Sequence, residues 1–149
     1  MRGSFRIASD PDLAMPHMTD SPRFTLNRNL VVLVPKEPFL QWVLEADPKP
    51  LNLTLEELRE DPDAFLISES TAEFAEDARR WVEHRWQMFF EHVLVDWYTD
   101  ESLWPKKRSL KMFREWFDIQ YHSMVWDLAV REPLELEDWG DEEAENDPS

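Results

Sequence analysis

The alternation of apolar and polar residues predicts three strands separated by helices. Residues 29–34 (NLVVLV) are a continuous apolar run that ends at Pro35, which is typical of a strand covered on both faces. Residues 63–68 (DAFLIS) predict a second strand. Residues 119–130 place apolar side chains on both alternating faces, so they predict a third strand that is central in the sheet or covered on both sides.

Helical spacing predicts short helices between these strands. Residues 36–46 follow a helical pattern with Pro38 in the first turn, where a missing N–H costs nothing. Residues 54–57 (TLEE) have the spacing of a capping box and start a helix that must stop before the next proline. A further helix, capped by Ser109, is predicted to reach about residue 117.

The longest predicted element is a single helix near residues 71–98. Residues 70–73 (STAE) have capping-box spacing and are expected to open it. At about 100° per residue its apolar positions fall on one stripe, and polar residues lie opposite. The stripe consists of Ala75, Ala78, Val82, Trp86, Phe89 and Val93.

This order of elements predicts an α+β or α/β fold with a small sheet of about three strands packed by helices. The segments between the strands are long enough for parallel pairing, so strand order and direction stay open. We predict one domain over residues 18–131 and an acidic, mostly disordered tail over 132–149. Residues 1–17 resemble an expression leader, since the chain starts with MRGS and His17-Met18 matches a common cloning junction.

The residue types that are missing exclude several classes of chemistry. The chain has no Cys, which rules out disulfides, thiolate metal sites and a cysteine nucleophile. Its two glycines, Gly3 and Gly140, leave no glycine-rich phosphate loop and no GxSxG turn. No run of about eighteen apolar residues is present to span a membrane. We therefore expect a cytoplasmic protein without a cofactor.

The charge of the chain is strongly negative and is concentrated near its C-terminus. There are 32 acidic and 16 basic residues, which give a formal net charge of −16 at pH 7. Nine acids and no base follow residue 131. The tail is either a solvated segment that aids solubility or an acidic arm for a basic protein partner, as in a mimic of nucleic-acid charge.

One basic cluster interrupts the acidic chain. Its members are Lys106, Lys107, Arg108, Lys111 and Arg114. Trp104 and Phe113 are placed to stack on nucleic-acid bases, but the net charge of the whole chain repels phosphate. Pairing with the protein's own carboxylates, or with an acidic partner, is therefore favoured over nucleic-acid binding.

Three polar residues interrupt the apolar face of the longest predicted helix. They are Arg85, His92 and Asp96. Asp96 follows His92 by one helical turn, so it could orient the imidazole of a small catalytic or ligand-binding site. The alternative is a structural network of paired groups, or a helix end that emerges into solvent. The residues that could complete a site are His122, Tyr98 and Asp100.

The same histidine and aspartate also have the spacing of metal ligands. His92 and Asp96 could share an ion with His122 or Glu91. No HExxH motif or histidine-rich cluster accompanies them, so we expect no metal site.

Residues 97–105 (WYTDESLWP) form a connection that is unusually rich in aromatic residues. Left in water, its aromatic side chains would make a large apolar patch. We predict that Trp97 and Trp104 fold back onto the core and that Asp100 or Ser102 caps the turn between them. The alternative is an interaction or homodimer surface that consists of Trp97, Tyr98, Trp104, Lys106, Lys107 and Arg108.

A resemblance to a known family rests on three motifs, WYTDESLWP (97–105), FREWF (113–117) and HSMVWDL (122–128). With these motifs the chain resembles a family of short, acidic, tryptophan-rich bacterial proteins of unknown function. The segment LNRNLVVLVP (26–35) extends the resemblance over most of residues 18–128. The resemblance implies an uncharacterised bacterial protein and supplies no catalytic residues.

Two functions from different classes follow from these observations. The first is a non-catalytic cytoplasmic interaction or accessory protein that uses its acidic surface. The second is a small enzyme or ligand-binding domain built around His92 and Asp96. The absence of catalytic motifs favours the first, whereas a cavity that holds these two side chains together favours the second.

Overall fold

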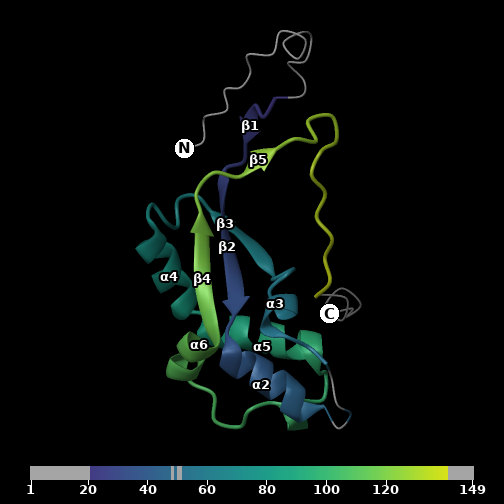
Figure 1. Cartoon of the computed structure of the whole chain (residues 1–149). Coiled ribbons are helices and arrows are strands. Elements are labelled where there is room, and N and C mark those ends of the chain that lie inside the picture. Colours follow the sequence, from purple (N-terminus) through teal and green to yellow (C-terminus); the bar gives the residue numbers. More distant parts are fainter. Residues whose placement is uncertain (1–20, 48, 50–51, 141–149) are drawn as a thin grey trace, which may run out of the picture. The chain divides into compact units, whose positions relative to one another are not determined.

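The computed structural model describes residues 21–47, 49 and 52–140 of the chain. The chain divides into two units, and the larger one is Thr25–Val125. The predicted leader over residues 1–17 lies outside the described residues. The larger unit carries every described helix and the main sheet, so the fold is essentially the fold of this unit (Figure 1).

Three antiparallel strands in the order β3-β2-β4 form the main sheet. β2 (Arg28–Pro35) is central, and β3 (Ala64–Ser68) and β4 (Phe117–His122) pair with its two edges. Helices follow β2 and β3 in the chain and pack on the sheet. The predicted α+β class is confirmed, and so are the first two predicted strands.

The third strand predicted over residues 119–130 is wrong in its length and its position. β4 ends at His122, and a separate short strand, β5 (Trp126–Asp127), pairs with β1 (Phe24–Thr25). The valine-rich β2 is the central strand because it offers apolar side chains on both faces, whereas Gln120 and His122 of β4 are exposed.

Local capping bonds explain where the short helices begin. The predicted short helices are confirmed as α2 (Glu37–Ala46), α3 (Leu55–Leu58) and α6 (Leu110–Trp116). At α3 the Glu57 N–H donates to Thr54 Oγ1 at 3.1 Å, and the Thr54 N–H donates to the Glu57 carboxylate at 3.0 Å. At α6 the Met112 N–H donates to Ser109 Oγ at 3.1 Å. No described helix is long and apolar enough to cross a membrane.

The single helix predicted near residues 71–98 is wrong. Two helices take its place, α4 (Ala75–Glu83) and α5 (Trp86–Trp97), and the chain turns at Arg85, whose φ is −119° and ψ is 27°. A straight helix over 71–98 would be about 42 Å long, whereas the eight residues of β2 span about 27 Å. After the turn, Phe89 and Phe90 of α5 join Ala78 and Val82 of α4 in the buried core. The Arg85 guanidinium stacks on Trp81, with its carbon 3.9 Å from the ring centroid.

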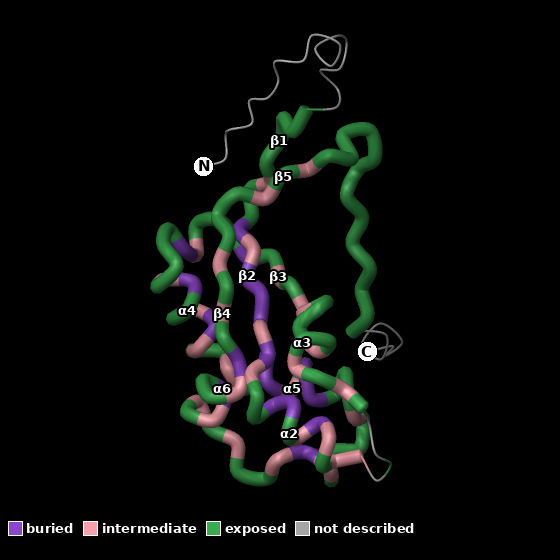
Figure 2. The backbone as a smooth tube through the Cα atoms, in the orientation of Figure 1, coloured by how far each residue is buried: buried purple, intermediate pink, exposed green. Residues whose placement is uncertain are grey.

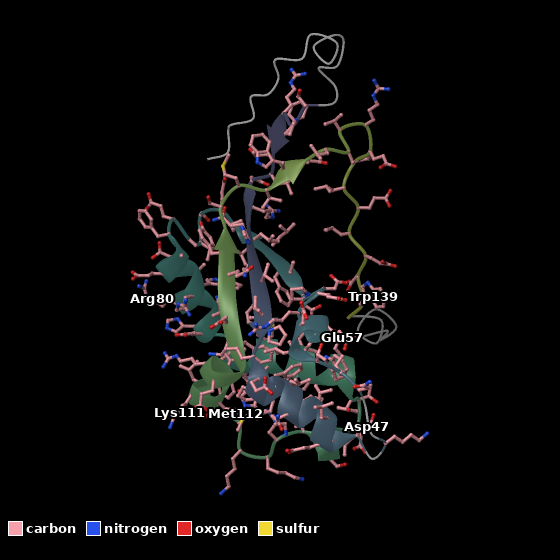
Figure 3. The ribbon with its side chains drawn as sticks, in the orientation of Figure 1. Asp47, Glu57, Arg80, Lys111, Met112 and Trp139 are labelled. Carbon is pink, nitrogen blue, oxygen red and sulfur yellow. The ribbon has the colours of Figure 1, made fainter. Side chains whose placement is uncertain are left out.

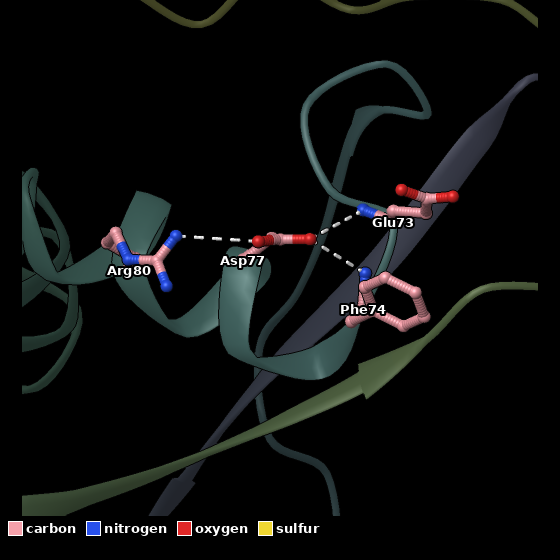
Figure 4. Close-up of polar contacts among 4 residues, drawn as sticks. All are labelled: Glu73, Phe74, Asp77 and Arg80. Atoms are coloured by element: carbon pink, nitrogen blue, oxygen red, sulfur yellow. Dashed lines mark hydrogen bonds and ion pairs between the residues drawn. The ribbon is translucent and has the colours of Figure 1, made fainter.

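A carboxylate from the first turn of α4 caps the N-terminus of this helix. The capping box predicted over residues 70–73 is therefore wrong as the start of the helix. Asp77 Oδ2 accepts the backbone N–H groups of Phe74 at 3.0 Å and Glu73 at 3.1 Å (Figure 4). These bonds hold the pKa of Asp77 below its ordinary value, and Arg80 adds a weaker contribution at 3.4 Å. The ionised form of this side chain therefore stabilises the start of α4.

Phenylalanine and valine are the commonest buried residues of the core, and β2 is buried along most of its length (Figure 2). Phe39, Phe89, Phe90 and Phe113 are each at most 2% exposed. The ring of Phe90 lies 5.8 Å from the rings of both Phe113 and Phe117, measured between centroids. Aromatic pairs at such distances contribute about 0.5–1.5 kcal/mol beyond simple burial. They join α5, α6 and β4 into one packed body.

The described residues of the smaller unit are mostly exposed. β1 and β5 supply its two-stranded sheet. Residues 128–140 contain no helix or strand, Leu136 is fully exposed, and Trp139 is 83% exposed. The described part of the predicted acidic tail, residues 132–140, is therefore surface.

Candidate functional site

A cavity of about 370 Å³ opens in the larger unit where α5 meets the end of the sheet and the connection from α3 to β3. Its volume lies within the range of about 300–1,000 Å³ that is usual for ligand pockets. It is lined by Leu33, Pro35, Phe39, Leu58, Asp61, Pro62, Asp63, Val93, Asp96, Trp97 and Phe117.

The floor of the cavity is apolar, and the sheet register explains why. Leu33 and Pro35 lie at the end of β2 and share one face, and Phe117 of β4 is opposite Pro35. Phe39 of α2 and Val93 of α5 complete the floor. All five side chains are buried, so they belong to the packed core. A ligand would therefore meet a preformed apolar surface.

Three carboxylates, Asp61, Asp63 and Asp96, line the same cavity. Asp63 lies beside Leu33, whose N–H donates to the Asp63 carbonyl at 3.3 Å where β3 begins. Asp96 follows Val93 by three residues on α5, so the two share one side of the helix. None of the described lining residues is Lys or Arg. The cavity thus joins an apolar floor to a negatively charged rim.

His92 reaches this rim from α5. Its Nε2 lies 3.2 Å from Asp63 Oδ2, and its ring meets Phe65 edge-on with centroids 5.4 Å apart. The potential ligand atoms of Asp63, His92 and Asp96 all lie within 4.8 Å of one another. The His92 side chain is 47% exposed. The predicted pair of His92 and Asp96 therefore meets beside an open cavity and not in closed packing.

Three other residues considered for this site do not join it. Arg85 lies at the opposite end of α5, about 16 Å from Asp96 along the helix axis. His122 lies at the end of β4, on the edge of the sheet opposite β3. Glu91 accepts a hydrogen bond from Arg108 Nη2 at 3.2 Å. The third member of the cluster is Asp63, which the sequence analysis missed.

Within the aromatic connection over residues 97–105, Trp104 packs onto the core as predicted. Trp104 is 9% exposed, and its Nε1–H donates to the Tyr98 carbonyl at 2.8 Å. The Tyr98 hydroxyl donates to the Val43 carbonyl at 2.7 Å. Burial raises the pKa of Tyr98, and the negative charge of Asp47 adds to this effect. Tyr98 therefore serves the fold and does not reach the cluster.

Trp97 follows the same prediction only in part, because it stays 38% exposed and lines the cavity. Its ring lies edge-on to Phe39, with centroids 6.4 Å apart. Asp100 caps the turn η3 (Glu101–Leu103), as expected, and so it is not available to the cluster. Its carboxylate accepts from the Ser102 hydroxyl at 2.7 Å and the Ser102 N–H at 3.0 Å, and these bonds lower the pKa of Asp100.

Two members of the basic cluster pair with the protein's own carboxylates, as predicted. Arg114 Nη2 lies 2.9 Å from Glu83 Oε1, and this hydrogen-bonded pair raises the pKa of Arg114. Arg108 pairs with Glu91 at 3.2 Å. The lysines of the cluster, Lys106, Lys107 and Lys111, are exposed, and Lys111 points away from α6 (Figure 3). Whether they contact a partner stays a prediction.

The sequence does carry a local sign of the missed carboxylates. Asp61 and Asp63 flank Pro62 directly before β3, and such a turn exposes polar side chains. The sequence alone does not reveal that β3 pairs with β2. This pairing brings Asp63 beside Leu33 and toward α5. The site therefore depends on contacts between residues that are distant in the chain.

The chain matches no family model, and no curated protein or solved structure matches it. The resemblance to tryptophan-rich bacterial proteins therefore stays a prediction.

Proposed function

We propose that this chain is a non-catalytic binding protein whose cavity accepts a positively charged group of a basic protein partner. One observation carries the proposal: the cavity combines a buried apolar floor with three carboxylates and no lining Lys or Arg among the described residues. Such a surface favours a ligand with an apolar body and a cationic end.

Electrostatics supports a cationic ligand. Asp63 is paired with His92, whereas Asp61 and Asp96 have no ion-pair partner among the described residues. An arriving cation would reduce the repulsion between these carboxylates. The net charge of −16 also attracts basic molecules over distances of about a Debye length. The charge therefore assists both the approach and the final contact.

The shape of the cavity supports a peptide side chain as the ligand. An aliphatic side chain would contact Leu58 and Pro62, which are partly exposed apolar residues of the lining. A neighbouring arginine or lysine would then lie between the carboxylates and the exposed part of Trp97, where a cation gains from the aromatic face. The proposed ligand is thus a basic segment that contains an apolar residue.

The residue types around the cavity support binding over covalent catalysis. The lining contains no Ser, Thr, Lys or Tyr among the described residues, and the chain has no Cys. A hydroxyl, thiol or amine nucleophile is therefore missing from the described lining, which leaves its three carboxylates as the groups that could act covalently. We retain the cytoplasm of a bacterium as the proposed location, and we disfavour a nucleic-acid ligand because of the charge.

A peptide titration followed by NMR tests this function. The probe is acetyl-Ala-Arg-Leu-Arg-Ala-amide, added to the ¹⁵N-labelled full chain at low salt. We expect the largest shifts at the Trp97 indole and at the amides of Val93, Asp96 and Asp63. The shifts should shrink as salt is added, since exposed charges are screened.

Two features of this titration separate specific binding from general attraction. A peptide with glutamate in place of both arginines should leave the cavity signals unmoved. Shifts confined to residues 132–140, or to Lys106 and Lys107, would contradict the proposal and move the binding surface away from the cavity.

A further inference from the structure

The cluster beside the cavity joins a histidine nitrogen to two carboxylates from separate parts of the fold. Asp63 directly precedes β3, and His92 and Asp96 lie one turn apart on α5. Their potential ligand atoms lie within 4.8 Å of one another. We infer that these three side chains bind a divalent first-row transition-metal ion, with Zn²⁺ as the reference ion.

The separation of the first two ligands fits a shared ion. His92 Nε2 and Asp63 Oδ2 are 3.2 Å apart. Two atoms that are each about 2.1 Å from one ion, at tetrahedral or octahedral angles, are about 3.0–3.4 Å apart. For Asp96 to be the third ligand, rotation of its exposed side chain must bring a carboxylate oxygen within about 4.2 Å of the other two ligand atoms, which is twice the metal–ligand distance.

The combination of one imidazole nitrogen with two carboxylates determines which metal ions the site would prefer. An imidazole nitrogen suits Zn²⁺, Co²⁺ and Ni²⁺, whereas Mg²⁺ and Ca²⁺ prefer oxygen ligands throughout. Three protein ligands leave at least one coordination position for water. Because Asp63 and Asp96 also line the cavity, the ion would stand at its rim.

The charge around the cluster favours a cation. Asp61 lines the same cavity and adds a third negative charge near the two ligand carboxylates. No described lining residue carries a positive charge that would repel an ion. A bound dication therefore offsets the mutual repulsion of the rim carboxylates.

The metal site goes beyond the proposed peptide function, with which it would compete for Asp63 and Asp96, and it is therefore tested without any peptide. The two proposals also predict different effects for two single variants. Asp61→Asn removes a charge from the peptide site and leaves all three metal ligands in place. His92→Ala removes a metal ligand and leaves every carboxylate of the peptide site in place.

Isothermal titration of Zn²⁺ into the EDTA-treated and dialysed full chain tests the site. His92→Ala and Asp96→Asn should each weaken binding at least about tenfold, since even the loss of a residue that only orients a ligand costs about 10–100-fold. His84→Ala is the matched control and should bind Zn²⁺ like the wild type, whereas Asp61→Asn, which removes a nearby charge but no ligand, should weaken binding much less than the ligand variants do. His84 is an exposed histidine outside the cluster. All these residues are at least partly exposed or lie at the rim, so the variants should fold.

Visible absorption of the Co²⁺ form supplies a second readout, because the bands change when a histidine ligand is lost. We expect the wild-type spectrum to change in His92→Ala and to persist in His84→Ala. Mg²⁺ should bind at least about tenfold more weakly than Zn²⁺. The inference is overturned if the wild type does not bind Zn²⁺, if His92→Ala binds it equally well, or if Mg²⁺ binds as tightly as Zn²⁺.

Discussion

Trp104 and Trp97 stand seven residues apart in one aromatic segment, yet the structure uses them in opposite ways. Trp104 is 9% exposed and donates its indole N–H to the Tyr98 carbonyl at 2.8 Å. Trp97 is 38% exposed and lines a cavity whose rim is acidic. Both belong to the aromatic motif that the sequence singles out. Residue type alone therefore does not separate a core anchor from a binding surface.

The difference lies in the neighbours of each side chain. Near Trp104, two hydrogen bonds tie the segment to α2: the Trp42 indole donates to the Leu103 carbonyl at 3.0 Å, and the Tyr98 hydroxyl donates to the Val43 carbonyl at 2.7 Å. The Arg108 guanidinium lies 5.6 Å from the Trp104 ring centroid, and its buried Nε has no hydrogen-bond partner among the described residues. Around Trp97, two carboxylates of the cavity have no ion-pair partner among the described residues. Trp104 is therefore held by hydrogen bonds of its own segment, whereas Trp97 lies beside exposed carboxylates that have no ion-pair partner in the described part of the chain, which is the arrangement expected of a binding surface.

Truncation of the buried member should cause the largest effect. Trp104→Ala should lower the free energy of unfolding by about 3–5 kcal/mol, because it removes a buried ring and leaves a cavity. Urea unfolding followed by circular dichroism measures this loss. Trp139→Ala is the control, since Trp139 is 83% exposed and should change stability by less than about 0.5 kcal/mol. A loss below about 1 kcal/mol for Trp104→Ala would show that this ring does not anchor the fold.

Truncation of the half-exposed member should separate stability from binding. Trp97→Ala should cost about 1 kcal/mol of stability, because its edge-on contact with Phe39 is lost while much of the ring is already in water. The same change should weaken the basic peptide at least about tenfold, as expected for an aromatic contact residue. A loss of stability as large as that of Trp104→Ala, with peptide binding intact, would reverse the assignment of the two tryptophans.

Removal of the Tyr98 hydroxyl should show how much one hydrogen bond of the aromatic segment contributes to stability. Tyr98→Phe should cost about 1 kcal/mol, since the Val43 carbonyl loses its donor. The pKa of Tyr98 is raised above its ordinary value of 10.0, so the stabilisation is present below that pH and is lost as pH rises through the folded value. Unfolding measured from pH 7 to 11 should show a smaller alkaline loss in the variant. Equal alkaline losses in both proteins would exclude Tyr98 as the source.

The smallest expected effect concerns the cap of α4. The pKa of Asp77 is lowered by the Phe74 and Glu73 amides, so its contribution is present above the ordinary value of 3.8 and is lost as pH falls through the folded value. Asp77→Asn should therefore reduce stability slightly at pH 7 and flatten the acid side of the stability profile. Glu76→Gln, an exposed neighbour on α4, should leave that profile unchanged. An unchanged profile in Asp77→Asn would show that the cap contributes nothing measurable.

Local signals predicted much of the fold. The apolar run at residues 29–34, the box at 54–57 and the Ser109 cap all act within a few residues, and each gave the correct element. The break at Arg85 was not predictable in this way, because no Pro or Gly marks it. The predicted place of the third strand was wrong for a similar reason, since Gln120 and His122 reveal their exposure only once β2 is central.

Two of the three residues of the candidate cluster could be predicted from the sequence. His92 and Asp96 share a helix, so their proximity follows from helical spacing alone. Asp63 is distant from both in the sequence, and it comes near them only because β3 pairs with β2. The cavity floor likewise needs Leu33 and Phe117, which meet only in the assembled sheet. Sequence spacing finds neighbours on one element, and packing supplies the rest.

The central claim is tested most directly by comparing two double variants in their binding of the basic peptide. One is Asp61→Asn/Asp96→Asn at the cavity rim, and the other is a matched variant of the acidic tail. Both positions lie on the rim, so stability should change by less than about 0.5 kcal/mol. Glu135→Gln/Glu137→Gln removes the same charge from exposed residues of the smaller unit. If the cavity is the binding site, the rim variant should lose at least about tenfold in affinity and the tail variant less than about threefold. Equal losses in the two variants, or a larger loss in the tail variant, would contradict the claim that the cavity is where this protein binds its partner.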